Sequence, residues 1–228
     1  MKQRMQRKDV IMTERFTDEL KNENIETWNA AIHHRFVNEL VEGTIPDAVL
    51  AGYLIQDYRF LDSFLALLGA AVTTADRLDS RLVFSKYIGE VAGDENTYFV
   101  DAFKEFNTPE SFRNNIPDTE STREFKKMFL DAAHSGHYAA VLAVLNVTEW
   151  IYITWASNAE GKRPERKVHY QWIDLHDYAG FHDFVGFLRN ELDRVGPEDS
   201  KIAREYFARA VKLERMFFDN SYESPAEI

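Results

Sequence analysis

Three acidic residues, Asp57, Glu149 and Glu214, occupy positions where a helix would otherwise be apolar. Apolar and aromatic residues recur around each acid in steps of three or four, and this spacing places side chains on one face of a helix. The stripes read Leu50, Tyr53, Asp57, Phe60, Leu61, Phe64; Leu142, Leu145, Glu149, Tyr152, Ile153; and Phe207, Val211, Glu214, Phe217, Phe218. We therefore expect three helices to direct a carboxylate into the core.

A carboxylate in such a position needs a reason to be there. An ionised carboxyl group that is buried without a partner costs free energy, so it takes up a proton, finds a donor or meets a polar ligand. Each acid alone is explained equally well as a core residue bonded to a neighbouring Tyr, Trp, Arg or Lys. A shared pocket explains all three, and its aromatic neighbours could sandwich a flat ring whose nitrogens the acids hold. The neighbours are Tyr53, Phe60, Trp150, Tyr152, Phe217 and Phe218.

Composition narrows the class of protein. The 228 residues, 45% of them hydrophobic, suffice for one domain with a sizeable core. A net charge of −11 argues against nucleic acid or an anionic membrane as partner. We find no apolar run that approaches a membrane span and no secretory signal, so we expect a cytoplasmic protein. The absence of cysteine removes disulfides and thiolate chemistry, leaving catalysis to carboxylates, His, Tyr, Ser, Thr or Lys.

The positioning elements are all predicted to be helices. The six prolines fall between periodic segments, and those segments show helical spacing, not the alternation of strands. We expect an all-α single bundle of seven to nine helices over residues 13–228, after a flexible N-terminal extension at 1–12. The first predicted helix ends near residue 42, before Gly43. The following helices are predicted at about 46–74, 80–91, 95–106, 119–136, 137–159, 165 onward, 178–195 and 198–220.

Several segments resemble the TenA family, the thiaminase II-like proteins. The family's G-T-L-P turn and Y-x-x-Q-D-x-x-Y-L motif are similar to GTIP at 43–46 and YLIQDYRFL at 53–61. The segment HHRFV at 33–37 resembles its H-P-F-V element, with Arg35 in place of proline. Further similarities lie at 135–152, 172–190 and 207–217, so the resemblance covers the chain from about residue 28. It implies a haem-oxygenase-like helical bundle.

The resemblance also implies catalytic roles. Asp57 aligns with the family aspartate that holds an aminopyrimidine ring, and Glu214 with a terminal-helix glutamate implicated in acid–base chemistry. Thr148 stands where the better-known branch has a nucleophilic cysteine, and the adjacent Glu149 is typical of the cysteine-less branch. We assign Glu214 to protonation of the leaving group and Glu149 to activation of water or stabilisation of an activated ring. The sequence does not order these two roles.

Five residues are predicted to bind the substrate. Tyr152 matches a pocket tyrosine, while Phe60, Phe125 and His176 occupy positions where the cysteine branch has tyrosines. Tyr53 belongs to the Asp57 stripe. Ring stacking should therefore be kept while some hydroxyl groups are lost. His176 either donates to the substrate or is a polar core residue bonded to a backbone carbonyl.

The resemblance implies a hydrolase of thiamin salvage that needs no metal or other cofactor. It would convert 4-amino-5-aminomethyl-2-methylpyrimidine, or its N-formyl derivative, to the hydroxymethylpyrimidine, as a homo-oligomer (dimer or tetramer). The alternatives are a thiaminase II acting on thiamin, a non-catalytic pyrimidine-binding regulator, and a di-iron oxygenase of the same fold. The last needs Glu-x-x-His pairs, and the only comparable pair here is Asp131-x-x-His134, near His137.

Overall fold

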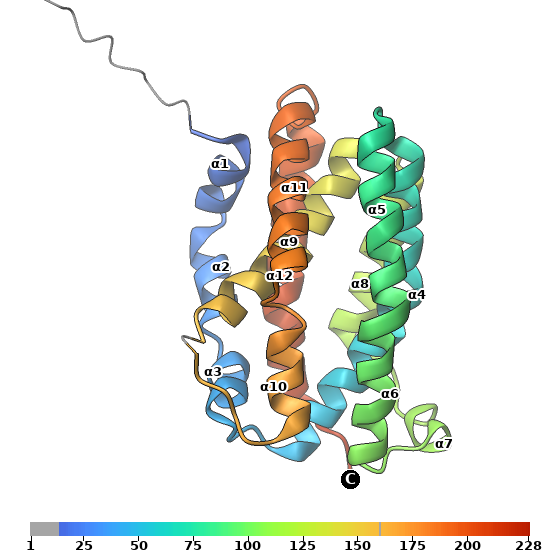
Figure 1. The fold of residues 1–228 in the computed structure, drawn as a ribbon, viewed down its shortest axis with the longest axis vertical. Coiled ribbons are helices and arrows are strands. Elements are labelled where there is room, and N and C mark those ends of the chain that lie inside the picture. The colour runs from blue at the N-terminus through green and yellow to red at the C-terminus, as the bar shows by residue number, and fades with distance from the viewer. Residues whose placement is uncertain (1–13, 160) are drawn as a thin grey trace, which may run out of the picture.

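The computed structural model describes residues 14–159 and 161–228, which form helices joined by short loops (Figure 1). The all-α class predicted from the sequence is confirmed, and the described residues contain no strand. The predicted extension at 1–12 lies outside the described residues. The helices are α1 Phe16–Glu23, α2 Ile25–Ile32, α3 Arg35–Glu42, α4 Asp47–Thr74, α5 Leu78–Glu90, the π-helix η1 Val91–Glu95, α6 Asn96–Glu105, α7 Glu110–Arg113, α8 Glu120–His134, α9 Tyr138–Ser157, α10 Lys167–Asp174, α11 Ala179–Val195 and α12 Ser200–Glu223.

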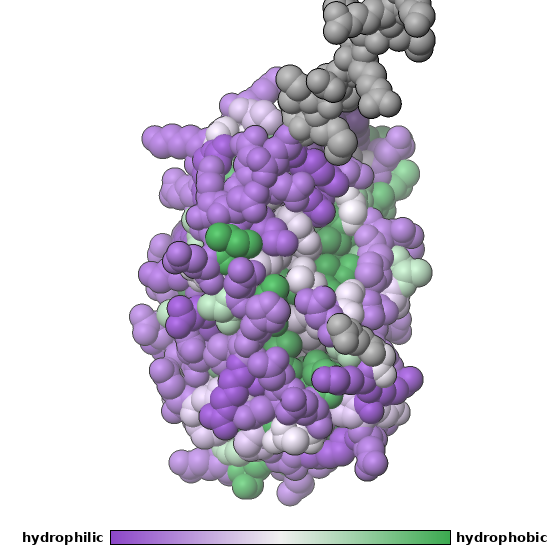
Figure 2. Space-filling model, turned by 90° about the vertical axis from the view of Figure 1, so that its left-hand side faces the viewer, coloured by the Kyte–Doolittle hydropathy of each residue, from purple (hydrophilic) through white to green (hydrophobic). Residues whose placement is uncertain are grey.

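Helix α9 is the central element of the bundle. It packs against α2, α4, α8, α11 and α12, and nearly all its side chains are buried. By length and composition it is the one helix among the described residues that could cross a membrane, a feature that the sequence analysis overlooked. Its burial inside the bundle explains its apolar composition. The side of the molecule formed by α1–α3 is, by contrast, mostly hydrophilic, with smaller hydrophobic areas (Figure 2).

The first predicted helix is wrong in one respect, because the structure divides it into α1, α2 and α3. The Asn24 side chain turns back to donate to the Leu20 carbonyl, and the chain bends there. His34 then caps α3 by accepting a hydrogen bond from the Phe36 backbone N–H at 3.0 Å. The predicted stop at Gly43 is confirmed, since this glycine adopts a left-handed conformation with φ of 71°.

The predicted break between 91 and 95 is also wrong. Helices α5 and α6 form one rod, because the π-helical turn η1 joins them without interruption (Figure 1). Gly93 lies inside this turn and keeps a helical backbone, so the helix continues through it. The described residues therefore form more helical segments than the seven to nine expected. Along this rod, however, the predicted interruption between two helices is absent.

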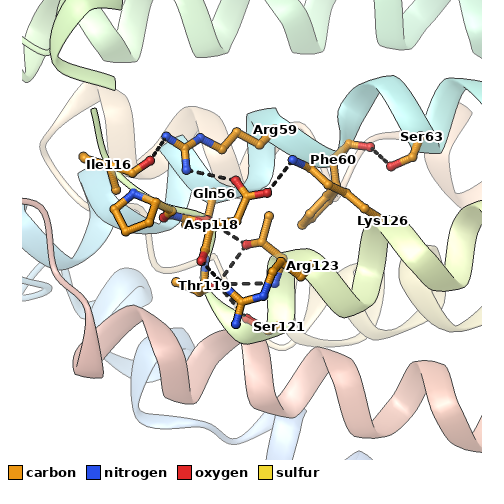
Figure 3. Close-up of polar contacts among 12 residues, drawn as sticks. Gln56, Arg59, Phe60, Ser63, Ile116, Asp118, Thr119, Ser121, Arg123 and Lys126 are labelled. Atoms are coloured by element: carbon orange, nitrogen blue, oxygen red, sulfur yellow. Dashed lines mark hydrogen bonds and ion pairs between the residues drawn. The ribbon is translucent and has the colours of Figure 1, made fainter. Parts of the chain in front are cut away.

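A polar network fastens the segment before α8 to α4 (Figure 3). The Gln56 amide donates to the Pro117 carbonyl at 2.9 Å and accepts from the Thr122 hydroxyl at 2.8 Å and the Thr119 backbone N–H at 3.1 Å. Arg59, one turn further along α4, donates to Asp118 at 3.0 Å. Because α4 and α8 are held in register, the neighbouring face of α4 has a fixed orientation.

Candidate active site

A cavity of about 690 Å³ lies inside the bundle, between α4, the α5–η1–α6 rod, α8, α9, α10 and α12. Asp57 from α4, Glu149 from α9 and Glu214 from α12 all line it. The three acids that periodicity singled out, separated by up to 157 positions, therefore meet in one space, as the sequence predicted. Such a volume suits a small organic ligand.

Asp57 is buried in the wall of the cavity. Burial raises the pKa of its carboxyl group to about 8; the Tyr53 hydroxyl opposes this shift, and the negative charge of Glu149 adds to it. A carboxyl group with such a pKa exists in both protonation states near neutrality. It can therefore share a proton with a ring nitrogen.

Glu149 lies on the central helix and has two hydroxyl neighbours. Tyr87 on α5 donates to its Oε2 at 2.9 Å, and the Thr148 hydroxyl lies 3.3 Å from its Oε1. Burial raises the pKa of Glu149 to about 7, although both hydroxyl groups lower it. Glu149 is therefore poised to gain or lose a proton at neutral pH.

Glu214 is the most deeply buried of the three acids, with 2% of its surface exposed. Within the described chain its carboxyl group receives no hydrogen bond. Burial raises its pKa well above the ordinary value, and the negative charges of Asp57 and Glu149 raise it further. The raised pKa favours the protonated form of Glu214, which can give up a proton.

Glu95, which the sequence analysis did not single out, adds a fourth carboxyl group to the cavity wall. It ends the π-helix η1, is half-buried, and has a pKa raised well above the ordinary value by burial and then by Asp57 and Glu149. The signal was present in the sequence, because Glu95 continues a helical stripe through residues 84, 87, 91 and 98. The predicted break between 91 and 95 cut that stripe in two.

Aromatic side chains form the other walls of the cavity. Phe60, Phe125, Tyr152 and His176, all predicted to bind the substrate, line it. The Phe60 and Phe125 rings lie 5.1 Å apart, and the Tyr152 and His176 rings lie 4.8 Å apart, measured between centroids. Two aromatic pairs, from α4, α8, α9 and the turn after α10, thus offer ring faces to a planar ligand.

Tyr53 takes a different place from its four companions. It is fully buried and does not line the cavity, and its hydroxyl group meets the Tyr152 hydroxyl at 2.6 Å. Tyr53 therefore supports Tyr152 and Asp57 from behind. Trp150 points away from the cavity altogether, since its ring packs against Trp28 at 4.9 Å and lies under Arg189 at 3.9 Å.

The proton on the His176 ring can be placed from its contacts. Its Nδ1 lies 2.7 Å from the Trp172 carbonyl oxygen, which can only accept, so Nδ1 carries the proton. Burial lowers the pKa of His176 to about 4, with the carbonyl contact opposing the shift. The ring is thus neutral, and its Nε2 is an acceptor.

Asp131, the acid of the only pair suggestive of a di-iron site, has cationic partners. Its carboxylate accepts from Lys127 at 3.1 Å and from Arg209 at 2.9 Å. In the part of the chain that the structure describes, no three His, Cys, Asp or Glu side chains are grouped so that they could hold a metal ion. Asp131 on α8 therefore forms ion pairs with Lys127 on the same helix and with Arg209 on α12.

Comparison with known proteins agrees with the geometry. Residues 23–224 match the model of the TENA/THI-4/PQQC family. The chain is 24% identical over 203 residues to an aminopyrimidine aminohydrolase of Helicobacter pylori, covering 86% of this chain and 94% of that protein. A second aminopyrimidine aminohydrolase, from Halalkalibacterium halodurans, is 19% identical over 201 residues, which are 86% of this chain and 90% of that protein.

Solved structures agree on the fold. A TenA homologue from P. horikoshii superimposes with a TM-score of 0.83 at 21% identity, covering 92% of this chain and all of the other. A protein from Silicibacter described as a TenA family transcription regulator gives a TM-score of 0.79 at 19% identity, covering 90% of this chain and 96% of that one. The expected haem-oxygenase-like bundle is thereby confirmed. The chain belongs to the TENA/THI-4/PQQC family.

Proposed function

We propose that this protein is a hydrolase of thiamin salvage, an aminopyrimidine aminohydrolase that converts 4-amino-5-aminomethyl-2-methylpyrimidine or its N-formyl derivative to the hydroxymethylpyrimidine. The observation that carries the proposal is the meeting of Asp57, Glu149 and Glu214 in one aromatic cavity, each with a raised pKa. Relatives that bear this activity as their name support it.

Asp57 holds the pyrimidine ring in this proposal. A 4-aminopyrimidine presents an amino donor beside a ring-nitrogen acceptor, and a carboxyl group can accept from the first while sharing a proton with the second. A pKa of about 8 suits that shared proton. The rings of Phe60, Phe125 and Tyr152 stack on or border the pyrimidine and exclude water from its faces.

Glu149 and Glu214 divide the proton transfers. Glu149 accepts a proton from water, the water oxygen bonds to the methylene carbon, and the carbon–nitrogen bond breaks. The nitrogen departs as ammonia with a proton that Glu214 supplies. A proton passing from Glu149 to Glu214 then restores the starting state. The raised pKa of each group allows both transfers near neutral pH.

The remaining features follow from the same proposal. The ligand is a small aminopyrimidine, the protein works in the cytoplasm, and it assembles as a homo-oligomer, either a dimer or a tetramer. The chemistry assigned to the three carboxyl groups calls for no cofactor. Thr148 lines the cavity beside Glu149, and because Glu149 is assigned to water, Thr148 is left to fill space and to support Glu149 through its hydroxyl group.

One observation favours a second function. A structural neighbour is described as a TenA family transcription regulator, and a regulator that only binds a pyrimidine would need Asp57 and the aromatic walls but not Glu149 or Glu214. Thiamin is the other substrate that the cavity could take. The regulator differs from the proposed hydrolase in not needing the two glutamates. The thiaminase differs from it in preferring thiamin as the substrate.

The test is ammonia release from the aminomethylpyrimidine, with thiamin hydrolysis assayed in parallel. We expect wild-type turnover of the aminopyrimidine and its collapse in Glu149→Gln and in Glu214→Gln. Glu191→Gln is the matched control, because Glu191 is a buried glutamate outside the cavity. Pyrimidine binding without turnover, unaffected by the two cavity variants, would favour the regulator.

A further inference from the structure

The charges that line the cavity are strongly unbalanced. Of the Lys and Arg residues that the structure describes, only Arg163 lines it, and Arg163 is exposed and paired with Asp174 at 2.7 Å. The lining carboxyl groups are those of Asp57, Glu90, Asp94, Glu95, Asp101, Glu149, Asp174 and Glu214. A space lined in this way favours a ligand that carries positive charge.

Glu95 and Glu214 line the cavity from different elements, the π-helical turn η1 and α12. The negative charges of Asp57 and Glu149 raise the pKa of both. Tyr87, on the same rod as Glu95, also lines the cavity and donates to Glu149. The rod that carries Glu95 therefore also carries the hydroxyl donor of Glu149.

Unlike Glu149 and Asp57, the half-buried Glu95 has no hydrogen-bond donor among the described residues. Glu149 already has the Tyr87 and Thr148 hydroxyl groups, and Asp57 has Tyr53 and, in the proposed function, the pyrimidine ring. No hydrogen bond from the described residues reaches the Glu95 carboxyl group. A partly buried carboxyl group without a donor is available to a cationic ligand, which would stabilise its charge.

We propose that Glu95 is a specificity-determining residue which, together with Glu149, holds the positive charge of the substrate's aminomethyl group. The inference rests on the proposed function and deepens it, because it names the protonated primary amine as the preferred substrate class over the neutral N-formyl derivative. A primary amine on a methylene group is charged at neutral pH, whereas a formamide is not. The ammonium passes its extra proton to the Glu95 carboxylate before hydrolysis, Glu214 protonates the leaving nitrogen as in the proposed function, and the departing ammonia takes the extra proton back from Glu95.

The π-helical turn offers a matched pair of acids for the test. Asp94 and Glu95 are adjacent in η1 and both line the cavity, but Asp94 is exposed and Glu95 is half-buried. We compare Glu95→Gln with Asp94→Asn, both of which keep size and remove charge. Glu95→Asp keeps the charge and shortens the side chain. Thermal unfolding of each variant establishes that it is folded.

The readout is the ratio of kcat/KM for the aminomethylpyrimidine to that for its N-formyl derivative. We expect Glu95→Gln to lower this ratio about ten- to hundredfold, as for loss of a hydrogen bond to a charged group, chiefly through KM. Asp94→Asn and Glu95→Asp should keep the preference within about threefold. Equal losses for both substrates, or no change in the ratio, would overturn the role of Glu95.

A binding measurement separates this inference from the proposed function. Dissociation constants for the aminomethylpyrimidine and the neutral hydroxymethylpyrimidine, two ligands of nearly equal size, can be measured without turnover. If the wild type releases no ammonia, the proposed function fails, yet a preference for the ammonium ligand that Glu95→Gln abolishes would still support cation recognition. Equal affinity of the wild type for the two ligands would contradict it.

Discussion

Two buried glutamates of this protein have opposite surroundings. Glu191 on α11 accepts hydrogen bonds from Ser80 and Tyr138, each at 2.9 Å, and from Arg194 at 2.7 and 3.0 Å. Glu214 on α12 is at least as buried but receives none from the described residues. The pKa of Glu191 is held below its ordinary value, because the Arg194, Ser80 and Tyr138 donors outweigh burial, whereas the pKa of Glu214 is raised.

The comparison separates a structural acid from one available for chemistry. Burial alone does not decide which a residue is, since both are nearly inaccessible. The supply of donors decides it: a carboxylate with three donors is locked in its ionised form, and a carboxyl group without them keeps an exchangeable proton. Glu214 has no donor among the described residues, so its proton stays available to a ligand.

The largest expected effect is that removing the charge of Glu214 lowers activity, whereas removing the charge of Glu191 lowers stability. Glu214→Gln should lower ammonia release at least about 100-fold, because the proton donor is lost, while leaving stability unchanged or improved. Glu191→Gln should do the reverse, costing about 2 kcal/mol of unfolding free energy because its donors lose a charged acceptor. Urea unfolding and turnover of both variants check this. Equal losses of activity would abolish the distinction.

The pH dependence of stability should also differ between the two regions. The pKa values of about 8 for Asp57 and about 7 for Glu149 lie above their values in the unfolded chain, so the native state binds more protons and loses stability as pH rises from about 4 to about 8. Glu191, with a lowered pKa, contributes stability above its unfolded value and loses it as pH falls below about 4.5.

Unfolding by urea across this pH range provides the measurement. A variant with Asp57→Asn and Glu149→Gln should show a flatter decline between pH 5 and pH 8, whereas Glu191→Gln should change only the acidic side. A decline that persists unchanged in the double variant would show that other groups carry it.

A smaller effect is expected when one donor is removed from each region. Tyr87 lowers the pKa of Glu149, so Tyr87→Phe should raise that pKa and move the acidic limb of the pH–rate profile to higher pH. Tyr138→Phe removes a donor from Glu191 and should leave the profile unmoved while reducing stability by about 1 kcal/mol. Profiles that shift equally in both variants would contradict this assignment.

The smallest effect is expected at Tyr53, which lies behind the cavity. Tyr53→Phe removes the hydroxyl contact to Tyr152 and the opposition to the raised pKa of Asp57. We expect a change of a few-fold in KM for the pyrimidine, with kcat nearly constant, because only the orientation of a binding residue is altered. Steady-state kinetics would reveal a larger role if kcat fell instead.

Helical periodicity predicted the cavity acids but could not have told them from Glu191. Asp57, Glu149 and Glu214 were found because each interrupts an apolar stripe, and Glu191 also lies on one, with residues 184, 188 and 195. Its donors come from α5, α9 and one turn further along α11, so only the tertiary arrangement shows that it is satisfied. Periodicity reports burial, and it says nothing about partners.

Other parts of the site escaped the sequence for local reasons. Glu95 was missed because the predicted break between 91 and 95 interrupted its stripe, and the backbone hydrogen bonding of a π-helical turn has no clear residue signature. Gln56 was noticed as part of the family resemblance next to Asp57, but its contacts with Pro117, Thr119 and Thr122 show a structural role. The family resemblance located the motif, but it did not show that Gln56 has a structural role while Asp57 lines the cavity.

The π-helical turn also sets the rotational phase of the whole second half of its rod. Compared with an α-helix, a π turn contains one extra residue, and one residue corresponds to about 100° of rotation. Deleting Ala92 would leave every acid of the cavity in the sequence and yet turn Glu95 and the side chains of α6 relative to α5. The aim of these side chains is thus encoded in the length of the backbone, which no substitution at a single position can reproduce.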